Sequence, residues 1–216
     1  MYKKLIIFDL DGTLLNTLSD LHRSVNFALE SEGLPGRSIE EIRSFVGNGI
    51  LNLVQRSVPS GTDEGKTLRV FEAFKCHYAL HSMDSTAAYD GIAELLEKLK
   101  ASDCRLGVVS NKADAAAKPI IAHYFPDTFD CVVGERDGVR KKPAPDSVLE
   151  LMRTLGCSPE ESVYIGDSEV DILTAKNAGC DFIAVSWGFR SRELLQKSGA
   201  STVCDTAADI AKLLEL

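Results

Sequence analysis

A short apolar run, Leu5–Phe8, opens the chain's hydrophobic pattern and leads into two aspartates separated by one residue, Asp9 and Asp11. An apolar run rich in Ile and Phe that ends at a glycine turn predicts a buried β-strand. Because side chains alternate along a strand, the two aspartates would point the same way, about 7 Å apart. Two crowded carboxylates need compensation, which Mg²⁺ can supply. Asp-Gly is also typical of an ordinary turn, so this stretch alone leaves both interpretations open.

The chain between Asn16 and Met83 has helical apolar spacing, and no strand is expected there. A first helix ends near Gly33, and the turn at residues 47–49 divides a second helical stretch. A third amphipathic helix is expected over residues 66–82. This block predicts a helical insertion after the first strand.

Strands and helices alternate at short spacing from Tyr89 onward, with strands expected at 105–109, 129–133, 162–165 and 181–185. Such alternation predicts βαβ units and a parallel sheet that the first strand joins. The expected fold is therefore α/β. Residues 1–15 and 86–216 form a Rossmann-like parallel sheet with helices on both faces, and residues 16–85 form an inserted α-helical cap domain.

The composition and charge of the chain argue against some classes of binding partner. The 216 residues are 44% apolar and carry a net charge of −8, which argues against nucleic acid or anionic membranes as main partners. An anionic substrate would need local positive charge from a metal or a few lysines. The six cysteines form no CxxC pair, no signal-like start is seen, and no apolar run approaches a membrane span. We expect a cytoplasmic protein with reduced cysteines that act as small core residues.

Two other patterns in the sequence, a P-loop-like stretch and the four histidines, do not indicate a binding site. Residues 60–67, SGTDEGKT, approach a phosphate-binding P-loop, but Ser60 replaces its first glycine and no strand is expected before it. The four histidines show no convincing metal-ligand spacing with acids.

The expected strand ends share a set of polar side chains, and ligands of open α/β sheets bind at the carboxyl ends of strands. Carboxylates, a hydroxyl and a lysine are the groups needed for metal-assisted phosphoryl transfer. In strand order they are Asp9 and Asp11, then Ser110 and Asn111, then Lys141 and Lys142, then Asp167 and Asp171.

Each of the later positions also has an ordinary structural explanation. Ser110 and Asn111 suit a helix N-cap, and Lys142 suits a solvated loop. Asp167 and Asp171 suit the first turn of a helix. Their joint occurrence at strand ends favours function, and the structural explanation stays competitive for Asp171.

Four motifs in this order make the chain resemble the haloacid dehalogenase superfamily of phosphohydrolases. They are FDLDGT at residues 8–13, VVSNK around Ser110, KPAPD beginning at Lys142, and GDSEVD at residues 166–171. The resemblance spans nearly the whole chain, with the cap inserted after the first motif.

The resemblance implies a role for each catalytic candidate. Asp9 would attack phosphorus and form an aspartyl-phosphate, and Asp11 would protonate the leaving oxygen and then activate water. Ser110 would hold phosphoryl oxygens, and Lys142 would offset charge on the phosphate and on Asp9. The implied substrate-binding set is Thr13, Ser110, Asn111 through its backbone, Lys142 and Gly47.

The resemblance also implies a metal site. Asp9, Asp167 and the backbone carbonyl of Asp11 would bind Mg²⁺. Asp171 would orient a metal-bound water or Lys142 from outside the ligand set.

The cap segments look most like phosphoglycolate phosphatases. Leu21 stands where the β-phosphoglucomutase branch usually carries a histidine, and Asn16 and Asp90 depart from common family residues. Hinges are expected near Leu15–Leu18 and residues 82–87. The turn at Gly47 either enters the site or simply joins two helices.

The expected function is Mg²⁺-dependent hydrolysis of a small phosphorylated metabolite, in the manner of a phosphoglycolate phosphatase, by a monomer or weak homodimer. A sugar phosphomutase and a pyrophosphatase of the same superfamily remain as alternatives. A non-enzymatic receiver module is also possible, although a receiver lacks the helical insertion.

Overall fold

The computed structural model describes residues 3–215. The chain separates into two compact units. One comprises the described residues up to Leu15 and from Ala88 onward, and the other is Asn16–Ala87. The chain passes between the units through two short strands that pair with each other, β2 (Leu15–Asn16) and β3 (Ala87–Ala88).

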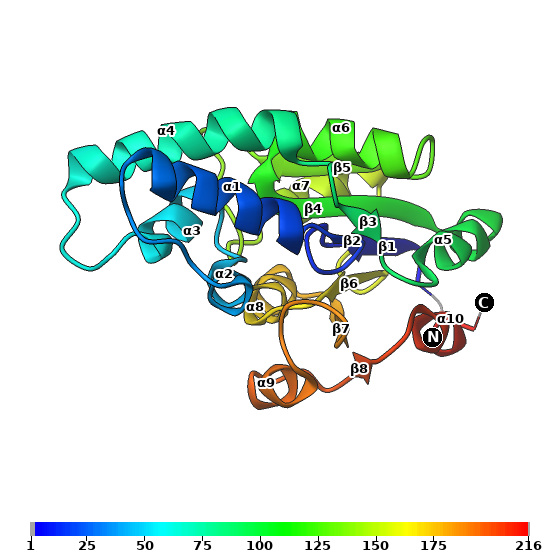
Figure 1. Ribbon diagram of the computed structural model, residues 1–216. Coiled ribbons are helices and arrows are strands. Elements are labelled where there is room, and N and C mark those ends of the chain that lie inside the picture. The colour runs from blue at the N-terminus through cyan, green and yellow to red at the C-terminus, as the bar shows by residue number, and fades with distance from the viewer. Residues whose placement is uncertain (1–2, 216) are drawn as a thin grey trace. The chain divides into compact units, whose positions relative to one another are not determined.

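The first unit is built on a six-stranded parallel sheet in the order β5-β4-β1-β6-β7-β8 (Figure 1). Its strands are β1 (Leu5–Phe8), β4 (Arg105–Ala113), β5 (Cys131–Glu135), β6 (Ser162–Gly166), β7 (Asp181–Val185) and β8 (Val203–Cys204). The strand order reverses between β1 and β6, and ligands of such sheets bind outside the carboxyl ends at that point. Asp9 follows β1 directly there.

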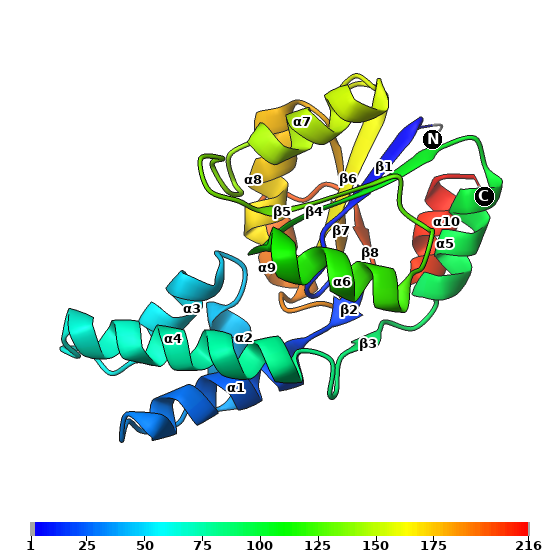
Figure 2. The ribbon, with the colours of Figure 1, turned by 90° about the horizontal axis from the view of Figure 1, so that it is seen from above.

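Helices cover both faces of this sheet: α5 (Ile92–Ala101), α6 (Asp114–Tyr124), α7 (Asp146–Leu155), α8 (Glu169–Ala178), α9 (Arg192–Lys197) and α10 (Ala207–Leu213). Alternation along β1 sends Ile6 and Phe8 into a core with α5, α6 and α10, and Leu5 and Ile7 into a core with α7 and α8. Figure 2 shows α7 and α8 on one side of the strands and α5 and α10 on the other. Each such buried side chain contributes about 1.5–3 kcal/mol, so β1 is held from both faces.

The predicted α/β fold with an inserted helical region is confirmed. The strands differ from the prediction in several details. β4 continues to Ala113 instead of ending at Val109, and β5 covers Cys131–Glu135 instead of residues 129–133. The short strands β2, β3 and β8 were not predicted. β8 has two residues, too few for a hydrophobic period to show.

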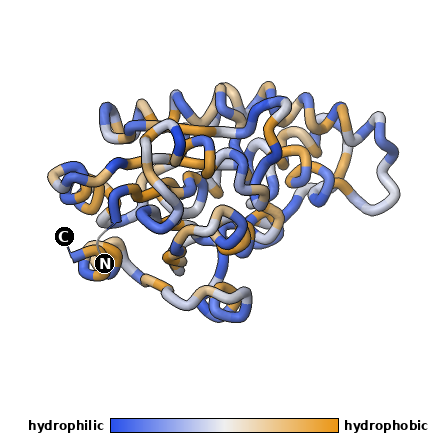
Figure 3. Tube along the Cα trace, turned by 180° about the vertical axis from the view of Figure 1, so that it is seen from behind, coloured by the Kyte–Doolittle hydropathy of each residue, from blue (hydrophilic) through white to orange (hydrophobic). Residues whose placement is uncertain are grey.

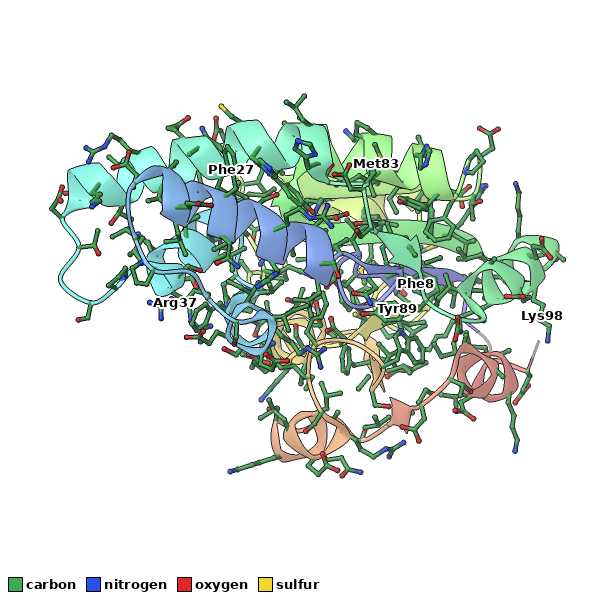
Figure 4. The ribbon with its side chains drawn as sticks, in the orientation of Figure 1. Phe8, Phe27, Arg37, Met83, Tyr89 and Lys98 are labelled. Atoms are coloured by element: carbon green, nitrogen blue, oxygen red, sulfur yellow. The ribbon has the colours of Figure 1, made fainter. Side chains whose placement is uncertain are left out.

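The second unit contains α1 (Leu18–Ser31), α2 (Ile39–Phe45), α3 (Ile50–Ser57) and α4 (Glu64–His81). Hydrophobic and hydrophilic positions alternate along the helical traces (Figure 3), as expected for helices that each bury one face. Arg37, labelled in Figure 4, donates from Nε to the Ser57 carbonyl and so joins the start of α2 to the end of α3. Gly47 and Gly49 both have positive φ, 126° and 81°, which fits the predicted turn between these helices.

Asp20 of α1 anchors the segment that leaves this unit. Its buried carboxylate accepts hydrogen bonds from the backbone N–H groups of Ser85 and Thr86 and from the Thr86 hydroxyl, at 2.9–3.0 Å. The residues before β3 are therefore held against α1.

The structure also bears on three further expectations, which concern the P-loop-like stretch, the cysteines and membrane-spanning segments. Residues 60–67 lie between α3 and the first turns of α4, so no strand precedes the P-loop-like stretch. All six cysteines are unpaired, but Cys76 is exposed on α4, so the expectation of core cysteines is wrong for it. Within residues 3–215, no helix has the length and apolar character needed to cross a membrane.

Candidate active site

Lys142 contacts two of the other predicted site residues and one residue that was not predicted. Its ammonium nitrogen lies 2.8 Å from Asp9 Oδ1 and 2.7 Å from Asp171 Oδ1, and it donates to the Tyr164 hydroxyl at 3.0 Å. All four side chains are buried. The carboxyl ends of β1 and β6 and the loop after β5 therefore meet at one point.

Burial and charge set the protonation of this cluster. Burial raises the pKa of Asp9 to about 7, although Lys142 lowers it. Burial alone would lower the pKa of Lys142, but the Asp171 and Asp9 carboxylates outweigh burial and hold that pKa well above its usual value. Lys142 is therefore charged at neutral pH, while Asp9 still lacks full compensation.

Asn111 fixes the backbone of Lys142. Its Nδ2 donates to the Lys142 carbonyl at 3.1 Å, and its Oδ1 accepts from the Lys142 N–H at 2.9 Å. With both side-chain polar atoms engaged in this way, its backbone is the part that suits the predicted contact with phosphate.

Tyr164 is a member of the cluster that the sequence did not reveal. It lies on β6, and its hydroxyl donates to the Val109 carbonyl at 2.9 Å while accepting from Lys142. Burial raises the pKa of Tyr164 well above its usual value, so it stays neutral. In the sequence it resembles any aromatic residue in a buried strand.

Asp167 occupies a space that two glycines leave open. Its Oδ2 accepts from the Phe189 N–H at 2.7 Å, and its Oδ1 lies 3.4 Å from the Thr13 hydroxyl. A Cβ at Gly12 would lie 2.4 Å from Asp167 Oδ2, and a Cβ at Gly188 would lie 2.4 Å from Asp167 Cβ. Glycine is required at both positions if this carboxylate is to stay where it is.

Among residues 3–215, the carboxylates of Asp9, Asp167 and Asp171 form the one acidic group with metal-binding geometry, each offering an oxygen within 4.8 Å of the others. Burial, with Asp171 and Asp9 nearby, raises the pKa of Asp167 well above its usual value. Carboxylate oxygens are the donors that Mg²⁺ prefers, and the raised pKa values show negative charge that a cation would relieve. The group could therefore hold a metal ion.

Asp171 is the member least suited to direct ligation. Its Oδ1 contacts Lys142, and its Oδ2 accepts from the Ser168 hydroxyl at 2.6 Å and the Ser168 N–H at 3.1 Å, which forms a capping box at the start of α8. Asp171 therefore lies in the first turn of α8, as its ordinary explanation predicted, and contacts Lys142 in the same geometry.

Asp11 lies beside Lys112, for which no role was predicted from the sequence. Lys112 Nζ is 3.1 Å from Asp11 Oδ1, and the Lys112 side chain is only 4% exposed. The signal was present, because Lys112 stands two residues after Ser110. It was missed because the strand was expected to end before Ser110.

A bulge in β4 determines the positions of three consecutive polar residues, Ser110, Asn111 and Lys112. Val109 pairs with Val133, but Ala113 pairs with Glu135, so β4 has two more residues than β5 over this interval. Such bulges re-aim side chains next to active sites. Here Ser110, Asn111 and Lys112 are all buried in succession, and the Ser110 hydroxyl accepts from the Lys112 N–H at 3.2 Å.

Gly47, the remaining predicted substrate-binding residue, belongs to the second unit at the α2–α3 turn. Its contact with substrate stays a prediction.

Comparison with known proteins identifies the family. The family model for haloacid dehalogenase-like hydrolases matches residues 6–185. The chain belongs to this family. The expectation of a phosphatase related to phosphoglycolate phosphatases is confirmed at the level of family and enzyme class.

Similar proteins match over nearly the full length. A phosphoglycolate phosphatase from Chromobacterium violaceum is 33% identical, with 98% of this chain and 96% of that protein covered. One from Mannheimia succiniciproducens is also 33% identical, with 98% of each covered. The crystal structure of a candidate phosphoglycolate phosphatase from Lactobacillus delbrueckii subsp. bulgaricus superposes with a TM-score of 0.95 at 38% identity, covering 99% of both chains.

Proposed function

We propose that this hydrolase cleaves 2-phosphoglycolate to glycolate and inorganic phosphate with Mg²⁺, through a phosphoryl group carried on Asp9. The observation that carries the proposal is the buried Asp9 carboxylate, 2.8 Å from the Lys142 ammonium and grouped with Asp167. The substrate is suggested by the relatives, which are phosphoglycolate phosphatases.

In the first step, Asp9 attacks phosphorus and the bond from phosphorus to the ester oxygen breaks. Asp11 gives its proton to that oxygen, and glycolate leaves. In the second step, Asp11 takes a proton from water, the water oxygen attacks phosphorus, and the bond from phosphorus to Asp9 breaks. Phosphate is released and both aspartates are restored.

Lys142 balances charge throughout. Its ammonium offsets the charge of Asp9 before attack and that of the phosphoryl oxygens afterwards. Ser110, Thr13 and the Asn111 backbone would donate to the same oxygens.

Asp9, Asp167 and the Asp11 carbonyl would hold Mg²⁺, which when bound neutralises phosphoryl charge. Asp171 would act on this site indirectly, by holding Lys142. We assign catalysis to the unit that carries the sheet and a capping role to Asn16–Ala87, with Gly47 in the cap turn that contacts substrate.

The test is turnover of 2-phosphoglycolate with Mg²⁺ and with excess EDTA, measuring both glycolate and phosphate. We expect equal amounts of the two products with Mg²⁺ and a loss of at least about 100-fold with EDTA. In a parallel assay with a sugar phosphate and its bisphosphate, transfer of the phosphoryl group to another position of the sugar without free phosphate would instead identify a phosphomutase. Release of phosphate only from pyrophosphate would identify a pyrophosphatase.

A further inference from the structure

A second buried lysine, Lys112, lies near the end of β4 and contacts the second aspartate of the Asp9–Asp11 pair. Lys142 contacts Asp9, whereas Lys112 contacts Asp11, at 3.1 Å from Oδ1 and 3.5 Å from Oδ2. Lys112 is as buried as Lys142, each side chain being 4% exposed. Burying a lysine costs desolvation free energy, which the nearby Asp11 carboxylate offsets in part.

The backbone holds Lys112 in this position. A Cβ at Gly134 on β5 would lie 2.7 Å from the Lys112 carbonyl and 2.6 Å from the Asp114 nitrogen, so β5 closes tightly against this part of β4. The Asp114 carboxylate also accepts from the Gly134 N–H at 2.9 Å. The bulged segment is therefore held closely against β5, and the direction of Lys112 is set by the sheet.

The position of Asp11 in the proposed reaction places Lys112 relative to substrate. If Asp11 donates to the leaving oxygen at a hydrogen-bond distance of about 2.7 Å, the Lys112 ammonium lies within about 6 Å of that oxygen. In 2-phosphoglycolate the carboxyl carbon is bonded to the carbon that carries the ester oxygen. Its carboxylate therefore falls within reach of the ammonium.

We propose that Lys112 is a specificity-determining residue that pairs with a carboxylate on the leaving alcohol, and so selects phosphate esters of small 2-hydroxy acids. This rests on the proposed function, since it assumes that Asp11 faces the leaving group. In this arrangement Lys142 serves the phosphoryl side and Lys112 serves the alcohol side.

The experiment compares 2-phosphoglycolate with its amide, glycolamide phosphate, in which a neutral group replaces the carboxylate. Both esters are assayed with Mg²⁺ on the wild-type chain and on Lys112→Met, which keeps the length of the side chain and removes its charge. The measured quantity is the ratio of kcat/KM for the two esters. We expect the wild-type ratio to favour 2-phosphoglycolate, and Lys112→Met to lower that ratio by about 10- to 100-fold, the usual value of one charge-assisted hydrogen bond.

Two variants act as controls. Lys141→Met removes an exposed lysine that contacts Glu135 at 3.7 Å, and it should leave the ratio unchanged. Lys112→Arg keeps a cation and should retain most of the preference. Because the ratio is taken within one preparation, a partly unfolded fraction of Lys112→Met cancels.

The outcomes separate the two claims. Equal losses of kcat/KM on both esters in Lys112→Met would mean that Lys112 only positions Asp11, which overturns the specificity role while the phosphatase stands. Absence of Mg²⁺-dependent turnover of either ester by the wild-type chain would overturn the proposed function itself.

Discussion

Lys142 faces two carboxylates and a tyrosine hydroxyl at once, with its ammonium within 3.0 Å of all three. Each contact comes from a different part of the chain: Asp9 after β1, Tyr164 on β6 and Asp171 on α8. A charge in this position satisfies buried anions that would otherwise be uncompensated. At the scale of single residues, this makes Lys142 a structural group as well as a catalytic one.

Replacing Lys142 by Met should therefore affect both stability and activity. We expect the free energy of unfolding at pH 8 to fall by about 3 kcal/mol, because Asp9 and Asp171 lose their shared cation. The pKa of Asp9, already about 7 with Lys142 lowering it, would rise further. The deficit should thus shrink at pH 5.5, where protonation removes the uncompensated charge.

Chemical denaturation at both pH values checks this, together with kcat/KM, which should fall at least about 100-fold. Lys141→Met, at the neighbouring exposed position, should change stability by less than about 0.5 kcal/mol. A Lys142→Met protein as stable as the wild type at pH 8 would contradict the charge balance described here.

The same scale shows what the sequence could and could not predict. Asp9 and Lys142 each had an ordinary explanation when taken alone, and they could be selected only because polar side chains recur at several expected strand ends. Tyr164 was not, since its hydroxyl contact with Lys142 depends on the pairing of β6 beside β1. Lys112 was missed because a bulge in β4 carries three polar residues inward, and no hydrophobic period reveals a bulge.

At the scale of elements, glycines in the loops that follow two strands leave the space that the Asp167 side chain occupies. The turn after β1 and the segment after β7 approach Asp167 through Gly12 and Gly188. The strands themselves were predicted from apolar runs. The close approach at Gly188 was not, because it joins residues far apart in sequence and leaves no local pattern.

Gly188→Ala should fill part of the space that the Asp167 side chain occupies, without changing any charge. The added Cβ would lie 2.3 Å from the Gly12 carbonyl and 2.4 Å from Asp167 Cβ, so Asp167 must move. We expect the apparent Kd for Mg²⁺, measured by titrating activity, to rise at least about 10-fold. Gly65→Ala, in the first turn of α4 where only side-chain atoms of Asp63 and Arg69 lie nearby, is the matched control and should leave this Kd unchanged. An unaltered Kd in Gly188→Ala would argue against Asp167 as a ligand.

At the scale of the whole molecule, the chain carries net charge −8 and yet concentrates two lysines and four acids around one strand end. In the folded state without a cation, burial raises the pKa of Asp9 to about 7 and that of Asp167 well above its usual value. The folded chain therefore binds more protons at these groups than the unfolded chain does. The contribution of Asp9 to stability is greatest below about pH 4 and is lost as the pH rises through about 7.

Stabilisation by Mg²⁺ should show the opposite dependence, because the cation competes with protons for the same carboxylates. We expect the rise in Tm on replacing EDTA by saturating Mg²⁺ to be several degrees at pH 8 and much smaller at pH 5.5. Asp9→Asn, which removes one titrating ligand, should lower the rise at pH 8. Thermal unfolding followed by circular dichroism checks this, and an equal rise at both pH values would be inconsistent with Mg²⁺ binding at these acids.

The central claim is that Asp9 carries the phosphoryl group. The most direct measurement is rapid acid quenching of the protein during turnover of 2-phosphoglycolate with Mg²⁺, followed by borohydride reduction and mass spectrometry of its peptides. We predict conversion of Asp9, and of no other aspartate, to homoserine, with no conversion in Asp9→Asn and a loss of turnover of at least about 1,000-fold in that variant. Full turnover by Asp9→Asn, or conversion at a different aspartate, would contradict the account.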